Sequence, residues 1–120
     1  MNDYQLGAVE ARFADIIWEN EPISSATLCK KSEELLRWKK STTYTVLKRL
    51  CDKGIFKNEN GSVSSCISRE NFYAEKSHKF VEEAFNGSLP AFLAAFTKRK
   101  GISESELKQL KQIINDYKGD

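Results

Sequence analysis

The sequence predicts a mainly α-helical fold with one small β-hairpin, in the order three helices, hairpin, three helices. Apolar residues recur every three or four positions over most of the 120 residues, which indicates amphipathic helices. Capping residues, glycines and a proline mark the ends of these stretches. The pair Asn60-Gly61 lies between two short extended runs, which is a strong signal for a hairpin.

The first two helices are predicted from their apolar stripes and their ends. The first covers about Leu6 to Glu19, and the proline at position 22 disfavours helix immediately before it. Its stripe consists of Leu6, Val9, Phe13, Ile16 and Ile17. The second begins near Ser24 or Ser25, either of which can cap it, and ends between residues 34 and 36.

A third helix is predicted within Trp38–Gly54, beginning near Lys40 or Ser41 and stopping at Gly54. At 100° per residue it has an apolar face and a polar face. The apolar face carries Thr43, Val46, Leu47 and Leu50, and the polar face carries Ser41, Tyr44, Thr45 and Lys48, with Thr42 and Arg49 at its edges. Such groups on a helix narrow enough for the DNA major groove can contact base edges and phosphates.

The hairpin is predicted from Ile55–Glu59 and Ser62–Ile67 on either side of Asn60-Gly61. Three helices followed by a hairpin is the order of a winged helix-turn-helix, in which the third helix enters the major groove and the wing lies beside the DNA backbone or the minor groove. A purely structural edge ribbon is the alternative for the hairpin. We therefore expect a DNA-binding domain over residues 1–68.

Residues 69–120 are predicted to form three further helices and a dimerisation domain. The first begins at Ser68 or Arg69 and ends at Asn86-Gly87, the second is capped by Ser88 and ends at Gly101, and Ser103 with Glu106 forms a capping box for the last. A short helical unit with so much apolar surface is marginally stable alone, and a two-fold dimer would bury that surface. Packing of these helices against their own winged helix is the alternative. The candidate dimerisation residues are Phe80, Leu89, Phe92, Leu93, Phe96, Leu107, Leu110, Ile113, Ile114 and Tyr117.

Charge is distributed unevenly along a chain whose net charge is only +2. Arg37 to Lys57 holds seven basic residues and one acid, a local charge of +6 that suits phosphate binding. A solvated helix face is the alternative interpretation of this cluster. No apolar run is long enough to span a membrane and the N-terminus does not resemble a secretory signal, so we expect a cytoplasmic protein without membrane insertion.

Cysteine and histidine usage argues against a metal site and against catalysis. Cys29, Cys51 and Cys66 form no close pair and His78 is the sole histidine, so no metal, cofactor or catalytic relay is expected. We expect the cysteines to be free thiols that pack as small hydrophobic groups. A winged-helix module that binds only other proteins remains the alternative to DNA binding.

Several segments together resemble the penicillinase-repressor family, the BlaI/MecI/CopY type of bacterial transcriptional regulator. The segments are IIWENEPISSATL, a Trp shortly before a Ser/Thr-rich helix, LKRLCDKGIF, and GSLPAFLAAF followed by an SxxE-capped helix. The resemblance extends from about Leu6 to Tyr117. It implies a homodimeric repressor that binds a double-stranded DNA operator with dyad symmetry.

The resemblance also implies roles for individual residues. Ser41–Lys53 matches the recognition helix, and Ser24 and Ser25 match phosphate-binding positions aided by backbone N–H groups. The full set of expected DNA-binding residues is Ser24, Ser25, Lys40, Ser41, Thr42, Tyr44, Thr45, Lys48, Arg49, Lys57 and Asn60. In the antibiotic-responsive branch a protease pathway inactivates the repressor. The matching bond here is Ala95–Phe96, where those relatives place Asn before Phe, and a helical segment that serves only as core is the alternative. The paired C-terminal cysteines of the copper-responsive branch have no match here.

Overall fold

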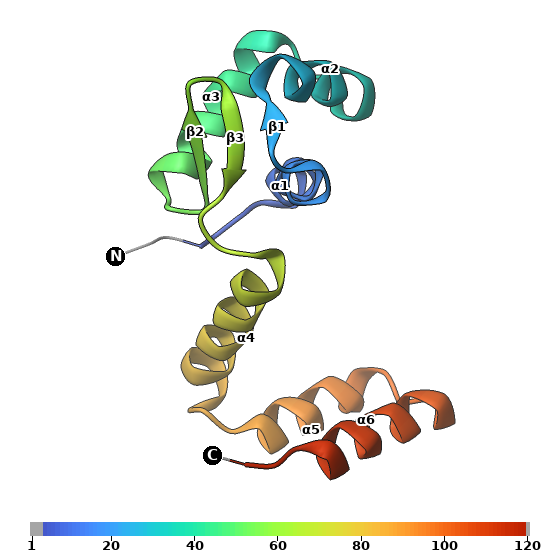
Figure 1. Ribbon diagram of the computed structural model, residues 1–120. Coiled ribbons are helices and arrows are strands. Elements are labelled where there is room, and N and C mark those ends of the chain that lie inside the picture. Colours follow the sequence, from blue (N-terminus) through green and yellow to red (C-terminus); the bar gives the residue numbers. More distant parts are fainter. Residues whose placement is uncertain (1–3, 120) are drawn as a thin grey trace. The chain divides into compact units, whose positions relative to one another are not determined.

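The structure is a computed structural model that describes residues 4–119 (Figure 1). Within these residues the chain forms six helices and three strands. In chain order they are α1 (Ala8–Asn20), β1 (Ile23–Ser24), α2 (Ser25–Leu36), α3 (Lys40–Asp52), β2 (Phe56–Glu59), β3 (Ser62–Ser65), α4 (Arg69–Phe85), α5 (Leu89–Arg99) and α6 (Glu104–Asp116). The predicted mainly α fold with a hairpin is confirmed, with α1 starting two residues later than expected and both hairpin strands shorter.

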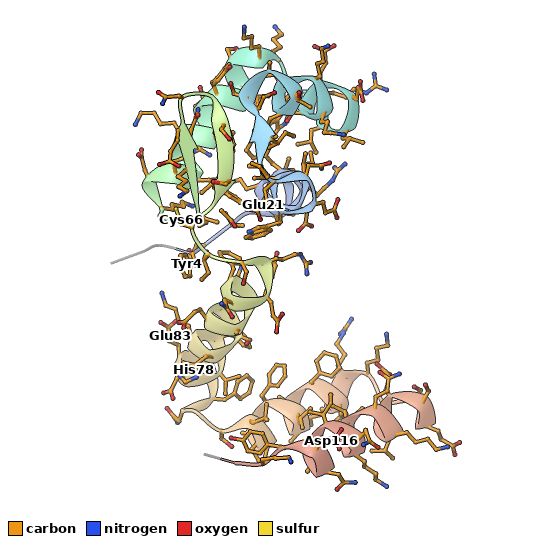
Figure 2. All side chains as sticks on the ribbon, in the orientation of Figure 1. Tyr4, Glu21, Cys66, His78, Glu83 and Asp116 are labelled. Carbon is orange, nitrogen blue, oxygen red and sulfur yellow. The ribbon has the colours of Figure 1, made fainter. Side chains whose placement is uncertain are left out.

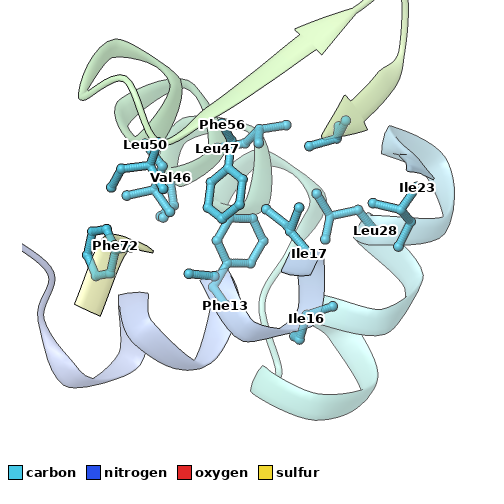
Figure 3. Packing of buried hydrophobic residues seen from close by; sticks show 13 residues of the cluster. Phe13, Ile16, Ile17, Ile23, Leu28, Val46, Leu47, Leu50, Phe56 and Phe72 are labelled. Atoms are coloured by element: carbon cyan, nitrogen blue, oxygen red, sulfur yellow. The ribbon is translucent and has the colours of Figure 1, made fainter. Parts of the chain in front are cut away.

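Residues 4–78 form one compact unit and residues 79–119 another, and each is described by itself. The core of the first unit is shared by the first three helices and the hairpin. Figure 3 shows Phe13 and Ile17 of α1 packed with Leu47 of α3 and Phe56 of β2. All four are at most 3% exposed. Because these side chains come from three segments far apart in sequence, they fix α3 against the body of the unit.

The hairpin belongs to a three-stranded antiparallel sheet in the order β1-β3-β2. Strand β1 was not predicted from the sequence; it is two residues long and pairs Ile23 with Val63. Such a strand carries no periodic pattern, and it forms because both side chains are buried in the core. The Glu21 carboxylate also accepts hydrogen bonds from the N–H and Oγ of Ser65, at 2.8 and 2.7 Å. The wing is therefore held at its base on two sides.

The first turns of α4 are docked onto the first unit through aromatic side chains. Phe72 is fully buried, with its ring centroid 5.2 Å from that of Tyr4 and 5.3 Å from that of Trp18. Tyr4 lies close to the start of α4 in Figure 2. The Trp18 indole N–H donates to the Ile67 carbonyl at 3.0 Å. Helix α4 thus starts in a fixed direction.

The second unit, residues 79–119, consists of the end of α4 with α5 and α6, and none of its residues is buried. Phe80, Phe85 and Phe92 form a ring cluster with centroids 5.7 to 6.1 Å apart. The expected helix ends are confirmed: Asn86 and Gly87 have positive φ after α4, Ser88 caps α5, and the Ser103–Glu106 capping box opens α6.

One buried hydroxyl in the first unit lacks a hydrogen-bond partner among the described residues, and it leads to a stability prediction. Ser32 of α2 is fully buried and its Oγ has no partner there. Ser32→Ala should raise the free energy of unfolding by about 1 kcal/mol, because the cost of desolvating that hydroxyl disappears. The measurement is chemical denaturation followed by circular dichroism.

Thr43 provides the matched control, since it is also fully buried but donates its Oγ1 proton to the Lys39 carbonyl at 3.2 Å. Thr43→Val should lower the free energy of unfolding by up to about 1 kcal/mol, because that hydrogen bond is lost. A loss of stability in Ser32→Ala would show that its hydroxyl has a partner in solution.

Candidate nucleic-acid interface

Helix α3 presents a continuous polar face to solvent. The residues predicted on its apolar face are all buried, and those predicted on its polar face are all exposed. The exposed set is Ser41, Thr42, Tyr44, Thr45, Lys48 and Arg49. The buried and exposed sets share no residue. The buried face packs α3 into the core, and the polar face stays outside the core.

The hydroxyl of Thr45 has a defined hydrogen-bonding state. Its Oγ1 lies 2.9 Å from the Ser41 carbonyl and donates its proton to it. With its proton used in this bond, the oxygen can act toward another molecule only as an acceptor, and the residue is exposed. An acceptor of this kind suits the exocyclic amino group of cytosine or adenine, and the methyl group suits thymine.

Tyr44 and Ser25 join α3 to α2 and to the tip of the wing. The Tyr44 hydroxyl donates to Ser25 Oγ at 3.2 Å, and the Ser25 N–H donates to the Gly61 carbonyl at 2.8 Å. Asn60 and Gly61 both have positive φ, as a tight two-residue hairpin turn requires. The turn was predicted from the sequence. No sequence pattern indicates the hydrogen bond between Tyr44 and Ser25, which lie 19 residues apart, or the backbone hydrogen bond from Ser25 to Gly61.

The expected phosphate site at the start of α2 needs a correction. Two of its backbone N–H groups are used inside the protein, because the Ser25 N–H binds Gly61 and the Thr27 N–H binds Ser24 Oγ at 3.0 Å. Fewer backbone N–H groups are therefore available to bind a phosphate than the resemblance implied. Ser24 and Ser25 still offer side-chain oxygens, and Ser24 is exposed.

Ion pairs reduce the basic field that the sequence suggested. Lys48 lies 3.1 Å from Asp52, and Lys57 on the wing lies 3.4 Å from Glu59. Within the described residues, the cations that form no ion pair include Lys39 and Lys40, at the start of α3. On α3, unpaired positive charge therefore lies at the N-terminal end of the helix, beside Ser41 and Thr42.

Arg49 is paired with a carboxylate from outside the predicted interface. Its Nη1 lies 2.9 Å from Oε2 of Glu10, on α1. The pKa of Glu10 is lowered, first by the hydrogen bond from the Gly7 N–H and then by Arg49 and Lys53, against an opposing effect of burial. Glu10 is therefore ionised at neutral pH. No pattern in the sequence indicates this pair, whose members lie 39 residues apart.

The three cysteines are free, with Cys66 exposed and the other two half-buried. Burial raises the pKa of the Cys51 thiol, which keeps it protonated at neutral pH. Among residues 4–119, no group of three or more potential ligands is placed to hold a metal ion. No helix in that range is long and apolar enough to cross a membrane.

Comparison with known proteins identifies the family. The family model described as penicillinase repressor matches residues 6–116, which is most of the chain. The chain belongs to the penicillinase repressor family. A transcriptional repressor is the class of function that this membership supports.

Named penicillinase repressors and related regulators align with nearly the full length of this chain. The penicillinase repressor of Bacillus licheniformis is 26% identical, with 95% of this chain and 92% of that protein aligned. The methicillin resistance regulatory protein MecI of Staphylococcus aureus (strain N315) is 22% identical, with 93% and 94% aligned. The penicillinase repressor of Staphylococcus aureus is also 22% identical, with 93% and 92% aligned.

The remaining expected sites of this penicillinase repressor family member lie in the second unit. The candidate dimerisation residues are half-exposed or exposed, with Ile113, Ile114 and Tyr117 between 65% and 69% exposed. Ala95 and Phe96 lie inside α5 and are exposed. A protease would need α5 to open at this bond, because a helical backbone is inaccessible to cleavage until it unfolds locally.

Proposed function

We propose that this transcriptional repressor binds a double-stranded DNA operator with dyad symmetry as a homodimer, acting in the cytoplasm. The observation that carries the proposal is the polar face of α3, whose residues are all exposed while those of the opposite face are buried. An α-helix fits the major groove, where each base pair presents a distinct pattern of donors and acceptors. Two such helices related by a two-fold axis would read two half-sites.

The contacts divide by chemistry into base contacts and backbone contacts. Ser41, Thr42 and Thr45 lie where base edges would be, and Arg49 at the far end of the face has the donors that recognise guanine. Lys40 at the start of α3 would meet phosphate, with Ser24 and Ser25 on α2 beside it. On the wing, Lys57 and Asn60 are exposed and would meet the neighbouring backbone.

Support for the homodimer comes from the apolar surface of residues 79–119. Helices α5 and α6 contain no buried residue, although α6 carries Leu107, Ile113 and Ile114 at 43% to 67% exposed. Apolar surface of this extent on short helices marks an interaction site. A second copy of the chain is the partner we propose, because a two-fold dimer covers the same surface on both copies and supplies the second half-site.

We also propose that cleavage at Ala95–Phe96 inactivates the repressor. Phe96 is 55% exposed and packs only against Phe92 among the aromatic rings described, at 6.1 Å. A cut in the middle of α5 would separate the apolar side chains on either side of it. Six of the ten candidate dimerisation residues, from Phe96 onward, would then be cut off from the DNA-binding part of the chain, and operator binding would weaken with the dimer.

Salt dependence of DNA binding tests the proposed function. The affinity for labelled duplex should fall with salt at a slope of about −0.9 per phosphate contact in log–log form. Lys40→Gln should make the slope shallower by about one contact, since its cation is lost. Selection of bound sequences from a random duplex pool should return two inverted half-sites.

Lys108→Gln is the matched control, because it removes a lysine from the exposed surface of α6. It should leave the slope of the wild-type protein unchanged. Binding that does not respond to salt, together with no selected sequence, would favour the alternative of a protein–protein interaction module.

A further inference from the structure

Glu10 uses its two carboxylate oxygens for two different partners. Oε1 accepts the Gly7 N–H at 3.0 Å and so caps the start of α1, while Oε2 accepts from Nη1 of Arg49 at 2.9 Å. The Glu10 side chain is only 19% exposed. The carboxylate is therefore fixed in position by its own helix before it contacts Arg49.

We propose that Glu10 is a positioning residue that sets the base preference of α3 by holding the guanidinium of Arg49 in one orientation. This inference rests on the proposed operator binding. It assigns to α1 a part in DNA recognition that neither the charge pattern nor the polar face of α3 indicates.

The geometry of the pair leaves Arg49 able to bind DNA. The contact to Glu10 occupies Nη1, and the guanidinium carries further N–H groups on Nη2 and Nε. The Arg49 side chain is 53% exposed, so the pair with Glu10 does not enclose it. A guanidinium held by one carboxylate has fewer orientations to lose when it binds a guanine edge.

A second ion pair on the same helix behaves differently and supplies a control. Lys48 and Asp52 are 78% and 67% exposed, and both side chains belong to α3. Solvent-exposed pairs of this kind impose little orientation on either partner. Removing the charge of Asp52 therefore takes away one negative charge, as removing that of Glu10 does, without releasing Arg49.

The test compares Glu10→Gln with Asp52→Asn in the full-length protein. Glutamine keeps an oxygen that can accept the Gly7 N–H, but its amide nitrogen replaces the oxygen that faces Arg49. We expect Glu10→Gln to reduce discrimination at one base position of each half-site by about fivefold or more. The readout is sequencing of duplexes bound from a random pool, and thermal melting confirms that the fold is retained.

The controls separate positioning from electrostatics and from folding. Asp52→Asn should strengthen binding to all sequences alike and leave base preference unchanged. In an Arg49→Ala background, Glu10→Gln should cause no further change in preference. Wild-type discrimination in Glu10→Gln, or an equal change in Asp52→Asn, would overturn the inference while leaving operator binding intact. A wild-type protein that selects no sequence would overturn both.

Discussion

Replacing Ile114 with aspartate should split the homodimer and weaken operator binding by about 10²-fold or more. Ile114 lies on α6 and is 67% exposed in a single chain. In the proposed dimer its side chain would be buried, and a carboxylate there would be desolvated without a partner. A monomer would bind only one half-site at a time, so the gain from two linked contacts would disappear. Sedimentation velocity and a binding titration on the selected operator measure the two effects.

Gln112→Asp is the control for that experiment. It places the same charge on α6 at an exposed position, about 160° around the helix from Ile114 and about 100° from Ile113. We expect this variant to remain dimeric and to bind the operator normally. An Ile114→Asp protein that sediments as a dimer would show that this stripe of α6 is not the interface.

Phe72→Ala should lower the free energy of unfolding by about 3–5 kcal/mol, because it opens a cavity among aromatic rings. Phe72 is fully buried, and its ring lies 5.0 to 5.3 Å from those of Tyr4, Trp18 and Tyr73. A loss of this size is a large part of the stability of a small domain. Urea denaturation at one fixed protein concentration measures it, since any dimer contribution depends on concentration.

The conservative variant Phe72→Leu should cost less, about 1 kcal/mol, because most of the volume remains. If Phe72→Ala unfolds at the same urea concentration as the wild type, the first turns of α4 do not dock as described. The difference between the two variants reports on the packing of the first turns of α4 against the first unit, because Phe72 belongs to that unit.

Helix positions and the split of α3 into two faces could be predicted from the sequence because both depend on local spacing. Thr43, Val46, Leu47 and Leu50 recur with helical periodicity, and all four are buried. Capping residues are equally local, as Ser24, Ser88 and Ser103 show. Such features need no knowledge of the tertiary structure.

Features that depend on contacts between distant segments could not be predicted. Strand β1 exists because Val63 lies opposite Ile23, and the wing tip is held because Gly61 accepts from Ser25. Arg37 adopts a left-handed conformation with φ of 61° at the end of α2, where glycine or asparagine would be expected. The pair of Glu10 with Arg49 likewise follows only from the packing of α1 beside α3. The dimer and the assignment of individual base contacts stay predictions.

The strict separation of the two faces of α3 affects how readily this repressor can be retargeted. Exposed residues without cross-element contacts can change with little effect on stability, typically within about 0.5 kcal/mol. Ser41, Thr42 and Thr45 meet this condition, since Thr45 bonds only within its own helix. Tyr44 and Arg49 do not, because each is tied to another element. Substitutions at the first three positions can therefore change the operator preference at little cost in stability. Substitutions at Tyr44 and Arg49 would also break a contact with another element.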